Sequence, residues 1–426
     1  MTTNVDKQQG NALPMIIVAG LFFILGFATW LNGSLMPYLQ QILQLTPFEA
    51  SLILFSFYIA VTFTALPSAT IIRKVGYKNG MALGMATMMV AGFLFIPAAK
   101  TQVFALFLFA QLVMGAGITL LQTAVNPYVV RIGPEESAAA RISVMGILNK
   151  GAGVVAPLVF TALILSGFSD VSGELTKVQI DDMANSLVFP YLGMALFLGL
   201  LALAVKKSPL PELESEEEIE GGKGHVKEAM SHPNLVLGVV ALFFYVAAEV
   251  IAGDTIGTYA LSLGIENYTM MTSYTMFCMV AGYILGIVLI PRFISQETAL
   301  MVSAIIGVVL TLGILFGDSN SYAIANTLLG GVQLPDTLVL IAFLGFANAI
   351  VWPAVFPLAL SGMGKLTSVG SALLVMGISG GAFGPMFWSI ASGGGLGEQG
   401  AYVVLLPCYA FILFYAVKGC KMRSWK

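Results

Sequence analysis

The sequence contains few charged residues. Only 10% of its 426 residues are Asp, Glu, Lys or Arg, whereas soluble domains average about 25%. Such a low content excludes a soluble multidomain enzyme, a disordered chain and a nucleic-acid-binding protein that depends on basic patches. Cysteine and histidine are scarce as well. The spacing of Cys278, Cys408, Cys420, His225 and His232 predicts neither a disulfide framework nor a metal site.

In place of charged residues, the sequence contains long apolar runs. A membrane-spanning helix needs about 20 mostly apolar residues, and twelve runs meet that length. They cover residues 14–40, 47–71, 79–99, 102–130, 140–166, 187–205, 234–262, 269–291, 298–316, 336–361, 367–391 and 399–418. No run shows the ten-residue alternation of a membrane β-barrel strand. The sequence therefore predicts an all-α, polytopic membrane protein.

The polar segments between these runs predict the topology. With a cytoplasmic N-terminus, the segments on the outer side hold only Lys100 and Lys177, and most other Lys and Arg residues lie inside. Both termini are then cytoplasmic, in a bacterial inner membrane. Residues 206–233 form a polar, Glu-rich linker between a half at 1–205 and a half at 234–426. The tetrapeptide Val-Met-Gly-Ile opens both the fifth and the eleventh span, which indicates that the two six-helix halves are related.

Three ionisable side chains lie inside the predicted spans. They are Lys150 in span five, and Glu249 and Asp254 in span seven. Burying a charge in a bilayer is costly, so each is a candidate for ion coupling by default. Lys150 needs an acidic partner, a neutral form or a watery cavity. Glu249 is the first choice of partner and Asp254 the second, and a static structural pair is the alternative.

Amide side chains inside the spans are candidates for sugar binding. Gln122 and Asn126 are four residues apart and share one helix face. Their donors and acceptors suit sugar hydroxyls, and this face carries no fixed charge. Asn32, Asn149 and Asn348 complete the predicted set of amides. The alternative is that these amides only hydrogen-bond neighbouring helices.

Two tryptophans complete the predicted binding residues. Trp30 and Trp352 lie in spans one and ten. The C–H face of a pyranose stacks on an indole ring while its hydroxyls bind amides. Lipid-facing or interfacial tryptophan is the alternative explanation.

Four segments together resemble one known family. They are residues 115–128 (GAGITLLQTAVNPY), 30–37 (WLNGSLMP), 244–250 (FYVAAEV) and 352–358 (WPAVFPL). In this order they are similar to signatures of the fucose:proton symporter group of the major facilitator superfamily, and in particular to its bacterial glucose/galactose transporters. The resemblance implies two parallel six-helix halves that rock about a central sugar site.

The departures from this family concern its acidic residues. The resemblance places an Asp of the fucose symporters at Gly33 and a Glu at Gln122, so neither group titrates in this chain. Gln122 resembles the glucose/galactose members instead. The Asn149–Lys150 pair resembles a branch associated with N-acetylglucosamine uptake.

The leading hypothesis is a monomeric importer of a neutral hexose or N-acetylhexosamine, such as glucose, galactose or N-acetylglucosamine. Protons or sodium would drive it, and no bound cofactor, metal or nucleic-acid partner is expected. A drug exporter and a non-transporting sugar sensor remain alternatives. An enzyme is not expected, because the sequence contains no nucleophile–base set, metal cluster or phosphate loop.

Overall fold

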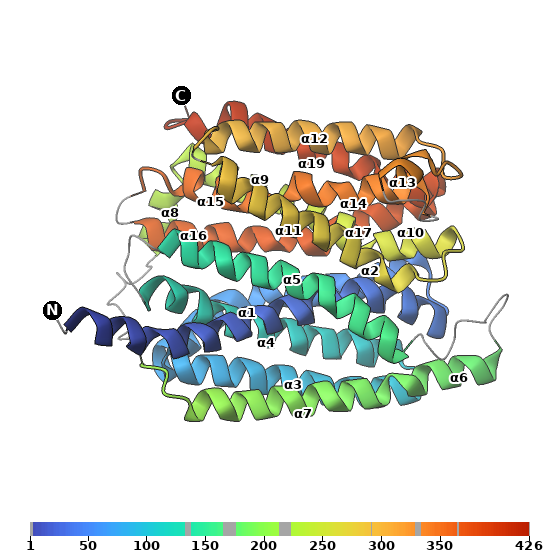
Figure 1. Ribbon diagram of the computed structural model, residues 1–426, viewed down its shortest axis with the longest axis horizontal. Coiled ribbons are helices and arrows are strands. Elements are labelled where there is room, and N and C mark those ends of the chain that lie inside the picture. Colours follow the sequence, from blue (N-terminus) through green and yellow to red (C-terminus); the bar gives the residue numbers. More distant parts are fainter. Residues whose placement is uncertain are drawn as a thin grey trace. The chain divides into compact units, whose positions relative to one another are not determined.

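The structure is a computed structural model that describes residues 3–132, 138–164, 176–212, 223–290, 292–328, 334–363 and 366–425. Every regular element within these ranges is helical (Figure 1). The predicted all-α fold is therefore confirmed. Helices satisfy their own backbone hydrogen bonds, which the interior of a bilayer requires.

Seven helices precede the linker in the part of the chain that the structure describes. Their bounds are α1 Thr3–Ile42, α2 Pro47–Val75, α3 Tyr77–Thr101, α4 Phe104–Arg131, α5 Ala138–Ile164, α6 Lys177–Ser186 and α7 Val188–Lys207.

Within the described residues, twelve helices lie in or after the linker, joined in places by short 3-10 and π turns, and the first of them belongs to the linker itself. Their bounds are α8 Lys223–Ala229, α9 Pro233–Asp254, α10 Ile256–Ser262, α11 Met271–Leu289, α12 Gln296–Phe316, α13 Ala323–Leu328, α14 Asp336–Ala349, α15 Val351–Leu360, α16 Thr367–Met376, α17 Gly380–Ala391, α18 Gly397–Gly400 and α19 Leu405–Val417.

The helical segments agree with the predicted spans. Eleven segments of the described chain are long and apolar enough to cross a membrane. The last of them, Val369–Lys421, contains both predicted spans eleven and twelve. A π turn at Ser392–Leu396 joins the two, and Gly395 at φ 103° bends the chain there.

The chain forms two compact units. The first comprises Met1–Leu31, Gln41–Gln44 and Ile59–Glu216. The second comprises Asn32–Gln40, Leu45–Tyr58 and Glu217–Lys426. One part of α1 and one part of α2 therefore belong to the second unit, and the rest of each helix belongs to the first. The second unit thus contains more than the C-terminal half of the sequence.

Small residues let helices approach closely in the first unit. Helices α3 and α7 lie side by side (Figure 1), and Phe95 stacks on Tyr191 with ring centroids 4.6 Å apart. Helices α3 and α4 also pack closely against each other. A β-carbon on Gly84 would lie 2.6 Å from the Leu121 nitrogen, and one on Gly117 would lie 2.8 Å from Met88. Glycine at such positions is typical of helix packing in membranes.

The first residues of the linker fold back onto this unit. Lys78 Nζ donates to the Ser208 carbonyl oxygen at 2.7 Å, and the Tyr128 hydroxyl donates to that of Pro211 at 2.8 Å. The Glu212 carboxylate accepts from the Lys78 backbone nitrogen at 3.4 Å. The segment 208–212 therefore connects the start of α3 with the end of α4. Most of the linker's predicted acidic run, at 213–222, lies outside the described residues.

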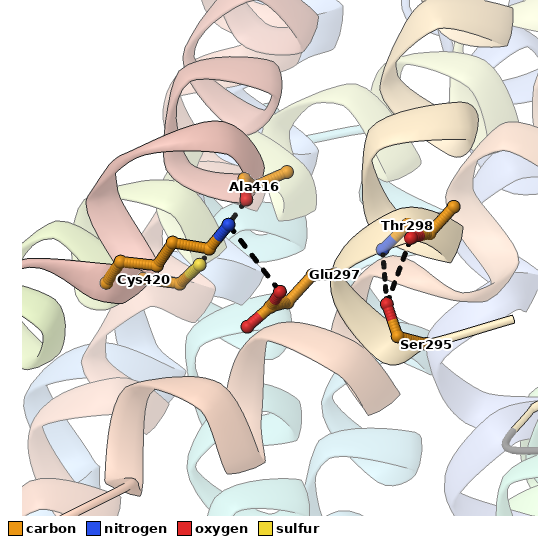
Figure 2. Close-up of polar contacts among 6 residues, drawn as sticks. Ser295, Glu297, Thr298, Ala416 and Cys420 are labelled. Atoms are coloured by element: carbon orange, nitrogen blue, oxygen red, sulfur yellow. Dashed lines mark hydrogen bonds and ion pairs between the residues drawn. The ribbon is translucent and has the colours of Figure 1, made fainter.

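Polar contacts hold the end of the chain against the start of α12 in the second unit. Ser295 caps this helix by accepting from the Thr298 nitrogen at 3.1 Å, and Lys421 Nζ lies 3.7 Å from Glu297 (Figure 2). Cys420 Sγ donates to the Ala416 carbonyl oxygen at 3.4 Å. Cys420, like the other two cysteines, is a buried free thiol.

One carboxylate organises the connection between α12 and α14. Asp336 accepts hydrogen bonds from the Ser321 hydroxyl at 2.5 Å and from the backbone nitrogens of Ala323, Ile324 and Ala325 at 3.0, 2.8 and 3.4 Å. It thereby caps the first turn of α13 from the neighbouring helix. The free N–H groups of a helix start require such an acceptor.

We expect Asp336→Ala to lower the free energy of unfolding by roughly 3 kcal/mol, because it leaves several partly buried donors without an acceptor. Thermal unfolding of the purified protein measures this. Asp318→Ala is the matched control, since Asp318 is exposed and the hydrogen bond of its carboxylate within the described residues comes from the Asn320 nitrogen, at 2.8 Å. Equal melting temperatures for the two variants would contradict the capping role.

Candidate functional site

The predicted amide face of α4 carries polar groups that the fold does not use. Gln122 is half-buried and Asn126 is exposed. No described residue forms a hydrogen bond with either amide side chain. The neighbouring hydroxyls differ, because Thr119 donates to Gly115 and Thr123 to Thr119 within the helix, both at 2.7 Å. The two amides, and not the threonines, are therefore available to a ligand.

Lys150 and Trp30 are brought together in the first unit. Lys150 Nζ lies 4.4 Å from the centroid of the Trp30 ring. Both side chains are buried, with 9% and 2% of their surfaces exposed. A cation above an indole face is stabilised by the ring quadrupole, by about 2 kcal/mol when desolvated. One face of Trp30 thus supports the ammonium, while its Nε1 has no hydrogen-bond partner among the described residues.

Asn149 lies where α1 and α5 cross. Its Nδ2 donates to the Phe22 carbonyl oxygen at 3.4 Å. A β-carbon on Gly26 would overlap the Asn149 backbone, with its Cα only 2.8 Å away. Glycine at 26 therefore lets α1 approach the turn of α5 that carries Asn149 and Lys150.

Tyrosines surround Glu249 in the second unit. Tyr245, one turn earlier in α9, hydrogen-bonds the Glu249 carboxylate. Tyr58 of α2, Tyr283 of α11 and Tyr409 of α19 interact with it electrostatically. Glu249 has 6% of its surface exposed. Tyrosines of four helices thus lie near this carboxylate, and Tyr245 hydrogen-bonds it.

Asn348 and Trp352 belong to the same cluster. The Tyr409 hydroxyl donates to Asn348 Oδ1 at 3.0 Å, and the Trp352 and Tyr245 rings lie 6.4 Å apart. Trp352 also stacks on Phe356 at 5.6 Å. Asn348 is fully buried, and its Nδ2 has no hydrogen-bond partner among the described residues. The structure therefore brings Glu249, Asn348 and Trp352 together.

Asp254 and Asn32 also belong to the second unit, and Tyr58 interacts electrostatically with Asp254 as well as with Glu249. Asp254 is the last residue of α9 and is fully buried. A β-carbon on Gly33, next to Asn32, would lie 2.7 Å from Asp254 Oδ1 and would overlap Thr272 Oγ1. Asn32 is buried as well. In the first unit, the candidate residues thus form one group where α1 and α5 cross (Trp30, Asn149 and Lys150) and one face of α4 (Gln122 and Asn126). In the second unit, they form a cluster around Glu249 and a region around Asp254.

The sequence analysis did not single out the tyrosines around Glu249 or the threonines near Asp254. Tyr245 carried a usable signal, because it precedes Glu249 by one helical turn. Tyr409 and Thr272 carried none, since they lie in other helices and meet the site only through tertiary packing.

The chain is similar to known proteins over most of its length. The family profile described as Major Facilitator Superfamily matches residues 18–385. A glucose/galactose transporter of Brucella abortus is 32% identical over 98% of this chain and 96% of its own length. The L-fucose-proton symporter of Escherichia coli is 28% identical over 97% of this chain and 95% of its own length.

A solved structure has a similar fold. A crystal structure of the transporter FucP in the outward conformation is 26% identical and has a TM-score of 0.71. The match covers 96% of this chain and 98% of that chain.

Proposed function

Because this chain belongs to the Major Facilitator Superfamily, we propose that it is a secondary active importer of a neutral hexose or N-acetylhexosamine. Glucose, galactose and N-acetylglucosamine are the candidate substrates. A cation, either a proton or sodium, drives uptake by symport through alternating access of the two six-helix halves. The relatives named as sugar transporters support this proposal.

One observation carries the choice of substrate class. Gln122 and Asn126 present amides on one face of an apolar helix, and no described residue uses them. Unpaired amides in a membrane protein are costly unless water or a ligand binds them. A neutral polyol supplies both donors and acceptors for them. An exporter of apolar drugs would gain little from such groups.

The remaining candidates have supporting roles in this proposal. Trp30, Asn32, Asn149, Asn348 and Trp352 are the other proposed sugar contacts. Lys150, Glu249 and Asp254 are the candidates for ion coupling, because they are the ionisable groups predicted inside the spans.

Uptake into proteoliposomes tests the function directly. We expect labelled glucose, galactose or N-acetylglucosamine to accumulate when an inward proton or sodium gradient is imposed, and accumulation to stop when the gradient is collapsed. Liposomes without protein give the background. Sugar binding without any uptake would favour a sensor, and expulsion of apolar dyes without sugar uptake would favour an exporter. Either outcome overturns the proposal.

A further inference from the structure

The seventh predicted span is interrupted at Thr255. Helix α9 ends at Asp254 and α10 begins at Ile256. Hydroxyls from α11 bind the last turn of α9. Thr272 donates to the Gly253 carbonyl oxygen at 2.7 Å, and Thr275 donates to that of Ala252 at 3.1 Å. The interruption therefore gathers oxygen atoms at a buried helix end.

Three of these oxygens converge beside Gly33 of α1. A β-carbon built there would overlap Thr272 Oγ1 and would lie 2.7 Å from Asp254 Oδ1 and 3.1 Å from the Gly253 carbonyl oxygen. Asp254 and Thr272 are fully buried. A carboxylate, a hydroxyl and a carbonyl oxygen thus lie close together, away from lipid and bulk water.

The direction of the Thr272 proton determines what these oxygens can bind. A threonine hydroxyl has one hydrogen, and that of Thr272 is given to Gly253. Toward Asp254 the hydroxyl therefore offers lone pairs, and the ionised carboxylate offers only acceptors. The C-terminal end of α9 adds partial negative charge. A cation that bridges these oxygens is therefore favoured over any anion. It is also favoured over a neutral ligand that has few hydrogen-bond donors.

We propose that Asp254, Thr272 and the Gly253 carbonyl form a monovalent cation site at the α9–α10 interruption, which takes a proton on Asp254 or a sodium ion between the oxygens. Both are hard cations with oxygen ligands, and interrupted helices supply such sites in secondary transporters. The proposal rests on the proposed cation-coupled function and names the residues that hold the coupling ion.

The same region connects the site to helix α1. Ser34 donates to the Thr269 carbonyl oxygen at 2.5 Å, and a β-carbon on Gly257 would lie 3.2 Å from the Gly33 carbonyl oxygen. The segment Asn32–Gln40 is thereby held against α10 and α11 within the second unit. Burying an ionised carboxylate under this segment is costly, and a bound cation removes most of that cost. Cation binding therefore stabilises this arrangement of α1.

Other titratable groups on the neighbouring helices have to be separated from Asp254. Inside the spans they are Tyr58 of α2, Tyr245 and Glu249 of α9, Tyr259 of α10, and Tyr274, Cys278 and Tyr283 of α11. Of these, only Glu249 ordinarily ionises below pH 8. Glu249→Gln is therefore included beside Asp254→Asn in the test.

The test uses the purified full-length protein in lipid nanodiscs without sugar. Melting temperature is measured while NaCl replaces choline chloride at pH 8, and separately while pH falls from 8 to 5 in choline chloride. We expect saturable stabilisation in one of the two titrations, which identifies sodium or the proton. Asp254→Asn abolishes this response, and a response lost in Glu249→Gln but kept in Asp254→Asn would place the cation at Glu249 instead.

Threonine variants provide the matched comparison. Thr272→Val is expected to weaken the apparent cation affinity roughly 5- to 150-fold, as for the loss of one buried polar contact. Thr311→Val is expected to keep the wild-type affinity, because Thr311 is also fully buried but donates only to Gly307 of its own helix, at 2.7 Å. If Asp254→Asn does not fold, this pair still decides the question.

Three results would overturn the site. They are a wild-type protein that responds to neither cation, an Asp254→Asn variant with the full response, and equal affinities for Thr272→Val and wild type. Cation binding is measured here without sugar. A cation response in a protein that transports no sugar would therefore overturn only the proposed function.

Discussion

Sugar affinity is expected to fall roughly 5- to 150-fold in both Gln122→Ala and Asn126→Ala, because each removes a hydrogen-bond partner that the bound substrate would cover. The free amides lie on one face of α4, so both variants should weaken binding of the same sugar. Titration calorimetry on the purified protein measures the change. The transport rate at saturating sugar should fall less than the affinity, because binding contacts are lost and the ion site is intact.

Asn79→Ala is the matched control for these variants. Asn79 is an exposed amide of α3, and its Nδ2 donates to the Val75 carbonyl oxygen at 2.9 Å. Its removal should leave sugar affinity unchanged. Normal affinity in folded Gln122→Ala and Asn126→Ala proteins would show that the two amides do not contact the substrate.

Lys150→Met is expected to abolish concentrative uptake while sugar binding survives. Methionine keeps an unbranched apolar stem against the Trp30 ring, so the helix crossing of α1 and α5 should persist. What is lost is the positive charge that the indole face supports. Burying a charged lysine inside a membrane protein is costly, so the charge of Lys150 is expected to take part in the balance of charges during the transport cycle. Accumulation against a gradient, measured beside equilibrium binding, separates the two effects.

The hypothesis that Lys150 and Glu249 act as one functional pair predicts a non-additive result. Glu249→Gln should lose accumulation as Lys150→Met does, and the double variant should be no worse than either single one. Lys177→Met, which changes an exposed lysine at the start of α6, is the control and should transport normally. Full accumulation by Lys150→Met would assign this lysine a purely structural role.

The helices were predictable because their signal is local. Twelve apolar runs of sufficient length predicted the spans, and the family comparison confirms both the fold and the assignment to transporters rather than enzymes. The interruption at Thr255 was not predicted. Residues 251–260 contain neither proline nor a run of polar residues, and the interruption depends on hydroxyls that α11 supplies from 19 and 23 residues away.

The candidate site was predictable only as an inventory of residue types. Intramembrane charge and amides identified Lys150, Glu249 and Asn348, but not the contacts that Trp30 and Tyr409 make with Lys150 and Asn348. Tyr409 meets Asn348 across 61 residues of sequence, and Lys150 meets Trp30 across two different helices. Such contacts follow from helix packing. A single sequence carries no periodic signal for them.

The close approach at Gly33 also constrains how this sequence can evolve. Any side chain at this position would collide with Asp254 and Thr272 unless those residues became smaller or α1 moved away. Substitutions at positions 33, 254 and 272 should therefore be correlated among descendants of a common ancestor. An acid at position 33, as the resemblance implies for the fucose symporters, is expected to accompany a smaller or uncharged residue at 254. The carboxylate would then come from α1 instead of α9 at the same contact. The acidic residue could thus move from one helix to the other during evolution while the cluster of oxygen atoms is kept.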